Sequence, residues 1–128
     1  MRKIIFIFLL VAVFTYPGVS HASSKLSSTD SIPAKEASQH YNENVKIYGT
    51  VSGGYLENSF ITLLNIDGNY SNHVLTIMIE DIDRKKFSYA PETFLKGKKI
   101  VVSGKVVDYK GKPEVIVTEV GQIMVVSN

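Results

Sequence analysis

A hairpin signal near the C-terminal end constrains the fold of this chain more than any other feature. Two runs rich in β-branched residues, 100–107 and 113–117, flank a Lys-Gly-Lys-Pro turn, a pattern typical of paired antiparallel strands. Gly104 stands in the middle of the first run. Because glycine weakens a strand, it usually marks a bulge, a sharp coil or a close backbone approach. A long, coiled hairpin late in a short chain predicts the last two strands of a small Greek-key barrel.

The first 22 residues have the three-part layout of a secretory signal peptide. Residues 1–3 are basic, residues 4–14 are nearly all apolar, and residues 20–22 supply small side chains at a cleavage site. The apolar run is too short to span about 30 Å of hydrocarbon. We therefore predict export with cleavage after Ala22, no membrane span in the mature chain, and a periplasmic or secreted location.

The composition excludes several kinds of site. The chain contains no Cys, which rules out disulfides and thiolate metal ligands. Its formal net charge is +2, and this excess disappears when Arg2 and Lys3 leave with the signal peptide. Net charge therefore does not indicate a general attraction to nucleic acid. The basic residues do cluster locally in the C-terminal half, at 84–86, 96–99 and 105–112, although such runs are usually solvated surface.

The mature chain reads as one domain preceded by a tail. Residues 23–31 are rich in Ser and predict a flexible tail, and residues 32–128 are enough for a single domain. A short helix is expected over residues 31–41, with Ser31 as its N-cap and Pro33 in its first turn.

Alternating apolar and polar residues predict three strands before the hairpin, at residues 45–51, 59–66 and 74–79. Residues 80–95 lose this alternation and predict a short helical segment, with Phe87, Phe94 and Leu95 closing one end. The result is an all-β, five-stranded Greek-key barrel with an N-terminal helix and a helical link between strands three and four. The expected core comprises Val45, Ile47, Val51, Leu63, Leu75, Ile77, Ile79, Ile100, Val102 and Val106.

Several of these patterns together resemble a known family. The first strand contains Gly-Thr-Val at residues 49–51, and the hairpin reads Gly-Lys-Lys-Ile-Val-Val-Ser-Gly-Lys-Val at 97–106 and Tyr-Lys-Gly-Lys-Pro at 109–113. With the helical link, they resemble OB-fold (oligonucleotide/oligosaccharide-binding) domains of the exported bacterial, nucleic-acid-binding-like type. The resemblance covers roughly residues 33–126. It implies a ligand face on strands two and three that extends to strand one and is bordered by loops at 52–58 and 108–113.

The resemblance also directs attention to tyrosines and lysines beside that face. Tyrosine rings there would stack on bases while ammonium groups sit near phosphates. The candidate ligand-binding residues are Lys46, Tyr48, Tyr55, Tyr109, Lys110 and Lys112. They predict a module that binds single-stranded nucleic acid weakly and without sequence preference. The alternative is an extracytoplasmic OB module that binds an envelope protein, a glycan or a small ligand.

Catalysis is not expected. The thermonuclease family shows that an OB barrel can carry phosphodiester hydrolysis, which needs carboxylates around a cation and arginines beside the phosphate. Here Asp67 is followed by Gly and Asn and not by the second acid of that family's motif, and Arg84 is the only arginine of the mature chain. His40 and His73 lack metal-ligand spacing. We therefore expect no enzyme, cofactor or metal, and phosphodiesterase-like activity is the less favoured alternative.

Overall fold

The computed structural model describes residues 30–126. The predicted signal peptide, most of the predicted tail and the last two residues lie outside this range. Within it the chain forms seven strands: β1 (Ser31–Pro33), β2 (Asn44–Glu57), β3 (Ile61–Ile66), β4 (Leu75–Glu80), β5 (Lys99–Tyr109), β6 (Lys112–Ile116) and β7 (Ile123–Val125). The helical elements are η2 (Ala34–Gln39), α1 (Asp81–Arg84), α2 (Pro91–Phe94) and η3 (Val120–Gln122).

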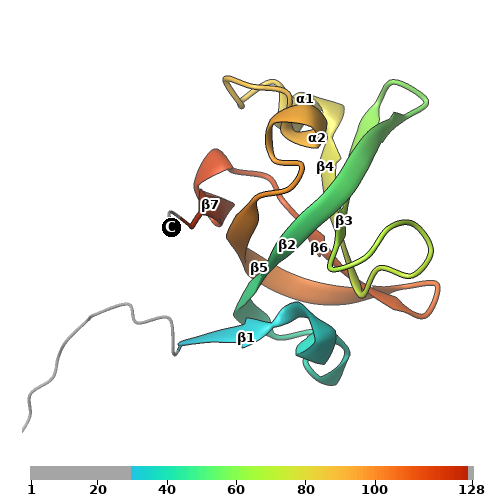
Figure 1. The fold of residues 1–128 in the computed structure, drawn as a ribbon, viewed down its shortest axis with the longest axis vertical. Helices are drawn as coiled ribbons and strands as arrows, with labels where there is room; N and C mark the ends of the chain where they lie inside the picture. Colours follow the sequence, from blue (N-terminus) through green and yellow to red (C-terminus); the bar gives the residue numbers. More distant parts are fainter. Residues whose placement is uncertain (1–29, 127–128) are drawn as a thin grey trace, which may run out of the picture.

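Five strands close into a ring. They pair in the order β2, β3, β4, β6, β5, and β5 pairs again with β2 (Figure 1). The β4–β6 pair is parallel and the other pairs of the ring are antiparallel. α1 and α2 lie at one end of the ring, and β1 and η2 lie at the other (Figure 1). The ring agrees with the predicted all-β class, and the short strands β1 and β7 extend it at β2 and β5.

The predicted hairpin is confirmed. Lys110 and Gly111 form its two-residue turn with φ of 52° and 87°, the pair of positive values that suits the twist of β5 and β6. The Gly111 backbone N–H donates to the Asp108 carboxylate at 2.7 Å. At Gly104 an added Cβ would lie 2.8 Å from the Val115 side chain, so this glycine marks the expected close approach of two strands.

β2 continues through residues 52–57, nearly all of the loop predicted at 52–58. A bulge follows Val51, and pairing with β3 resumes at Gly53 and continues to Glu57. The connecting turn is therefore only residues 58–60. A Cβ at Gly54 would lie 2.8 Å from the backbone oxygen of Leu63, so the absence of a side chain lets β2 and β3 pass closely. Gly53 and Gly54 are therefore part of a paired strand, and the prediction of a loop at these positions was wrong.

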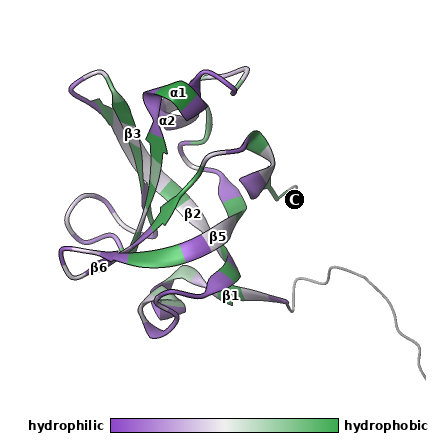
Figure 2. Ribbon diagram, turned by 180° about the vertical axis from the view of Figure 1, so that it is seen from behind, coloured by the Kyte–Doolittle hydropathy of each residue, from purple (hydrophilic) through white to green (hydrophobic). Residues whose placement is uncertain are grey.

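Alternation along the strands places one face of the ring in the core. Figure 2 shows hydrophobic and hydrophilic residues mixed along the strands. Eight of the ten predicted core residues are buried: Ile47, Val51, Leu75, Ile77, Ile79, Ile100, Val102 and Val106. Val45 is only partly buried against the core. Leu63 was assigned to the wrong face, because Thr62, Leu64 and Ile66 are the inward residues of β3.

The N-terminal helix is shorter than predicted. Ser31–Pro33 pairs with β2 in parallel as β1, so Ser31 does not cap a helix, and the six-residue 3-10 turn η2 follows it. Ala34 and Ala37 bury their methyl groups under the ring.

The predicted helical link exists as two single turns, α1 and α2. Phe87 and Leu95 are buried there as expected, but Phe94 is 45% exposed and covers Tyr89 from outside. No helix within residues 30–126 is long and apolar enough to cross a membrane.

Candidate ligand-binding groove

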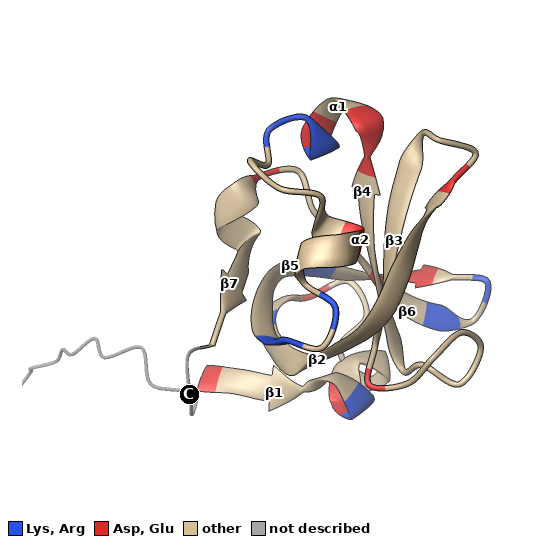
Figure 3. Cartoon of the chain, turned by 45° about the horizontal axis from the view of Figure 1, so that its top comes forward, with Lys and Arg blue, Asp and Glu red and all other residues tan. Residues whose placement is uncertain are grey.

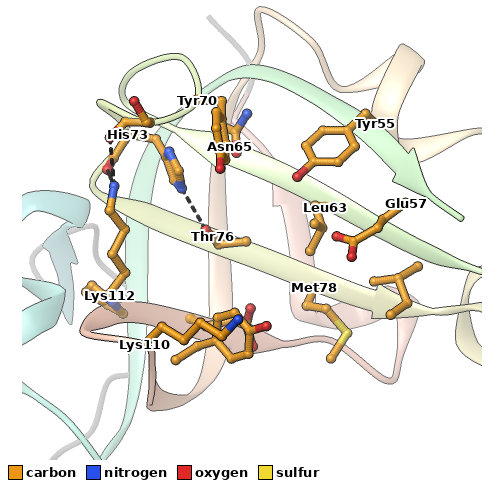
Figure 4. Close-up of a pocket in the computed structure, with 15 residues that line it drawn as sticks. Tyr55, Glu57, Leu63, Asn65, Tyr70, His73, Thr76, Met78, Lys110 and Lys112 are labelled. Carbon is orange, nitrogen blue, oxygen red and sulfur yellow. Dashed lines mark hydrogen bonds between the residues drawn. The ribbon is translucent and has the colours of Figure 1, made fainter.

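An open groove of about 470 Å³ lies on the outer face of β3 and β4. Its base is formed by Leu63 of β3 with Thr76 and Met78 of β4, the residues that alternate with the buried ones. Tyr55 and Tyr70 stand on one side of this base, and Lys110 and the stem of Lys112 lie on the other (Figure 4). The groove therefore lies between β2 with the 67–74 segment and the tip of the β5–β6 hairpin. We call this space the groove.

One wall of the groove is aromatic. Tyr55 is on β2, and Tyr70 and His73 belong to the segment between β3 and β4. The rings of Tyr70 and His73 are stacked, with centroids 5.9 Å apart and planes 23° apart. Burial raises the pKa of the Tyr55 phenol, and the nearby Glu57 and Tyr70 add to this effect. The wall thus presents two tyrosine rings, and Tyr70 is 71% exposed.

The opposite wall comes from the hairpin, and its two lysines differ. The Lys110 ammonium lies over the ring of Tyr109, 5.2 Å from its centroid, and Tyr109 is 54% exposed. The Lys112 ammonium donates hydrogen bonds to the backbone oxygens of Ser71 at 2.8 Å and His73 at 3.2 Å. Lys112 therefore ties the 67–74 segment to β6, whereas Lys110 keeps its charge at the groove edge.

Three polar residues that line the groove are deeply buried. Asn65 is 6% exposed, and His73 and Glu114 are each 7% exposed. His73 Nε2 is 2.9 Å from the Thr76 hydroxyl. Burial is the main cause that lowers the pKa of His73, Lys112 lowers it further, and the backbone of Asn69 acts in the opposite direction. Burial alone raises the pKa of Glu114.

Formal charges in the groove balance. Lys110, Lys112, Glu57 and Glu114 all line it. The groove is therefore a mixed surface with aromatic walls and not a basic channel.

The basic cluster at 84–86 is paired with acidic side chains. Arg84 bonds to Glu92 at 2.7 Å, and Lys86 contacts Asp83 at 3.1 Å and Glu119 at 3.0 Å. Basic and acidic residues are interspersed over the ribbon (Figure 3). The 84–86 run therefore serves the packing of the helical end.

Four of the six predicted ligand residues line the groove: Tyr55, Tyr109, Lys110 and Lys112. Tyr55 does so from a strand, not from a loop as predicted. Lys46 and Tyr48 lie elsewhere, on the half of β2 that pairs with β1 and β5. The bulge after Val51 separates that half from the half that carries Tyr55.

Sequence reasoning missed Tyr70, His73, Glu57 and Glu114. Tyr70 follows the Asp-Gly turn at 67–68 in a segment without periodicity, so no pattern marked it. Glu114 lies in the run 113–117, which was interpreted only as a strand of the hairpin. Within residues 30–126, no cluster of three or more His, Asp or Glu residues is arranged to hold a metal ion.

No known protein family and no curated protein matches this chain. Solved structures do match it. An aspartyl-tRNA synthetase from Entamoeba histolytica aligns with a TM-score of 0.53 and 12% identity, over 91% of this chain and 28% of that one. A protein described as an aspartyl-tRNA synthetase from Leishmania major Friedlin aligns with a TM-score of 0.52 and 14% identity, over 88% of this chain and 23% of that one.

This chain has an OB-like all-β fold. At such low identity the likeness concerns the fold alone, and the chain spans about a quarter of the length of the two synthetases. The ring of five strands and the position of the groove on β3 and β4 are in line with the resemblance drawn from the sequence.

Proposed function

We propose that this protein is a binding module without chemistry, and that its groove holds single-stranded nucleic acid weakly and without reading a defined sequence. One observation carries the proposal. Tyr55, Tyr70 and Tyr109 border a single open groove and are 40%, 71% and 54% exposed. Exposed rings on both walls suit unpaired bases, since every base has a face that can stack.

The Lys110 ammonium at the groove edge supports a nucleic-acid ligand, because a phosphate can approach it without breaking a hydrogen bond of the fold. The two structural neighbours are named as enzymes that act on tRNA, which favours nucleic acid among the ligands of this fold. The proposed contact set is therefore Tyr55, Tyr70, Tyr109 and Lys110, with Lys112 holding the wall in place. Lys46 and Tyr48 are not part of it.

The balanced charge of the groove favours a second candidate, a glycan or small polar ligand. Carboxylates at Glu57 and Glu114 repel phosphate but accept hydrogen bonds from hydroxyl groups, and tyrosine rings pack against sugar rings. Export directed by residues 1–22 would place the module outside the cytoplasm, where such ligands abound. This candidate, like the first, requires no catalysis.

Titration of the protein with fluorescently labelled single strands at low salt tests the leading proposal. Because only Lys110 is available for a phosphate at the groove, we expect weak affinity. The logarithm of the binding constant should fall as the logarithm of the salt concentration rises, with a slope of about 0.7 for each phosphate contacted. Absence of binding at tens of micromolar protein would overturn it. A parallel titration with neutral oligosaccharides then tests the second candidate.

A further inference from the structure

Glu114 is a largely buried acid whose carboxylate lies at the surface of the groove. It lies in the middle of β6, where it pairs with Thr76 of β4 and Val107 of β5, on the face opposite Val115 of the core. Although it faces the groove, it is only 7% exposed. Among the residues that the structure describes, none forms a hydrogen bond or an ion pair with its carboxylate.

None of the donors that line the groove bonds to Glu114. Lys112, two residues away on the same face of β6, donates to the backbone oxygens of Ser71 and His73. The Thr76 hydroxyl lies 2.9 Å from Nε2 of His73, and the Lys110 ammonium lies over the Tyr109 ring. A largely buried acid usually finds a partner within the fold. The Glu114 carboxylate has none there, so it is an acceptor open to a donor group of a ligand in the groove.

We propose that Glu114 accepts a hydrogen bond from the exocyclic amino group of a base held in the groove. The inference rests on the proposed function and adds to it a preference for one kind of base. Stacking on the tyrosines tolerates any base, but an ionised carboxylate can only accept. Cytosine presents an amino group on its pairing edge, where thymine presents a carbonyl oxygen that the carboxylate repels. Strands that place cytosine in the groove bind more tightly than strands that place thymine there.

The test compares oligo-dC with oligo-dT of the same length, at the same low salt and neutral pH. The two share backbone charge and pyrimidine size, so a difference in affinity reports on the base edge. We expect wild type to bind oligo-dC at least about five-fold more tightly. Glu114→Gln keeps the shape of the side chain and offers both a donor and an acceptor, so the ratio should approach one.

Glu57→Gln is the matched control, because Glu57 is a carboxylate of the same groove that is exposed at the end of β2. It should change the affinity for both strands together and leave their ratio intact. Equal binding of the two strands by wild type, or an unchanged ratio in Glu114→Gln, would overturn this inference and leave the proposed function standing. Failure of both strands to bind would overturn the proposed function and the inference with it.

Discussion

The ammonium of Lys112 lies 2.8 Å from the backbone oxygen of Ser71, so a lysine that the sequence offers as a phosphate contact serves to join two parts of the groove wall. Lys110, two positions earlier, forms no such bond and lies over the Tyr109 ring. Lys110 and Lys112 flank the same turn glycine, but Lys112 stabilises the groove wall whereas Lys110 is available to a ligand.

Substituting each lysine by methionine should separate these tasks, because methionine keeps an apolar stem and removes the ammonium. Lys112→Met should lower the free energy of unfolding by about 1 kcal/mol, since it removes two hydrogen bonds that anchor the 67–74 segment. Lys110→Met should leave stability nearly unchanged. Denaturant unfolding of the two variants checks this, and equal stability loss in both would contradict the assignment.

The same pair should differ in nucleic-acid binding. Lys110→Met should weaken binding and reduce the logarithmic salt slope by about 0.7, as expected for the loss of one phosphate contact with a single strand. Titrations at several salt concentrations measure the slope. A slope that stays the same would show that Lys110 is merely solvated surface.

Tyrosine variants should map the contact surface. Tyr55→Ala, Tyr70→Ala and Tyr109→Ala should each weaken binding of a single strand by about 1–3 kcal/mol, the range found for base stacking, and leave the salt slope alone. Tyr48→Ala is the control, because Tyr48 is 46% exposed but lies outside the groove. If Tyr48→Ala weakens binding as much as the others, the ligand face has been placed wrongly.

Much of the ring follows from sequence alternation, but β3 shows where the pattern is ambiguous. In β4 the branched apolar residues Leu75, Ile77 and Ile79 stand at every second position, and all three are buried as predicted. In β3 two leucines are adjacent, so hydropathy alone fits either phase, and the register with β2 and β4 decides that Leu64 points inward.

The same limit applies to the groove. Tyr109 and Lys110 follow from the hairpin, because a turn is a local signal. Tyr70 and His73 lie in a segment that Lys112, about 40 residues away in the sequence, helps to hold, and that contact leaves no local pattern. Lys46 and Tyr48 lie outside the groove, because the bulge after Val51 separates their half of β2 from the half that carries Tyr55.

The phase of β3 can be checked by a pair of alanine substitutions. Leu64→Ala should lower the free energy of unfolding by about 2–5 kcal/mol, because Leu64 is fully buried and a cavity would remain. Leu63→Ala should cost under about 1.5 kcal/mol, because Leu63 faces the open groove. Denaturant unfolding measures both, and a reversed order would place the wrong face of β3 in the core.

Glu114 should make stability depend on pH. Burial raises its pKa above the ordinary value of 4.5, so the folded state holds a proton that the unfolded state releases. Its favourable contribution is therefore complete below pH 4.5 and is lost as pH rises through the folded pKa. Glu114→Gln cannot ionise and should be more stable than wild type at neutral pH.

Unfolding of wild type and Glu114→Gln across this pH range checks the sign. The stability gap should be present at neutral pH and close as the solution is acidified below the ordinary pKa of the group. A variant less stable than wild type at neutral pH would mean that the carboxylate has a stabilising partner.

The central claim is that the groove holds single-stranded nucleic acid, and amide chemical-shift mapping by NMR tests it most directly. Titration of the isotope-labelled protein with an unlabelled single strand at low salt should shift the amides of Tyr55, Tyr70 and Lys110 and their neighbours on β3 and β4. The amides of Lys46 and Tyr48, on the other half of β2, should stay in place. Shifts centred on Lys46 and Tyr48, or no shifts at saturating strand, would contradict the account.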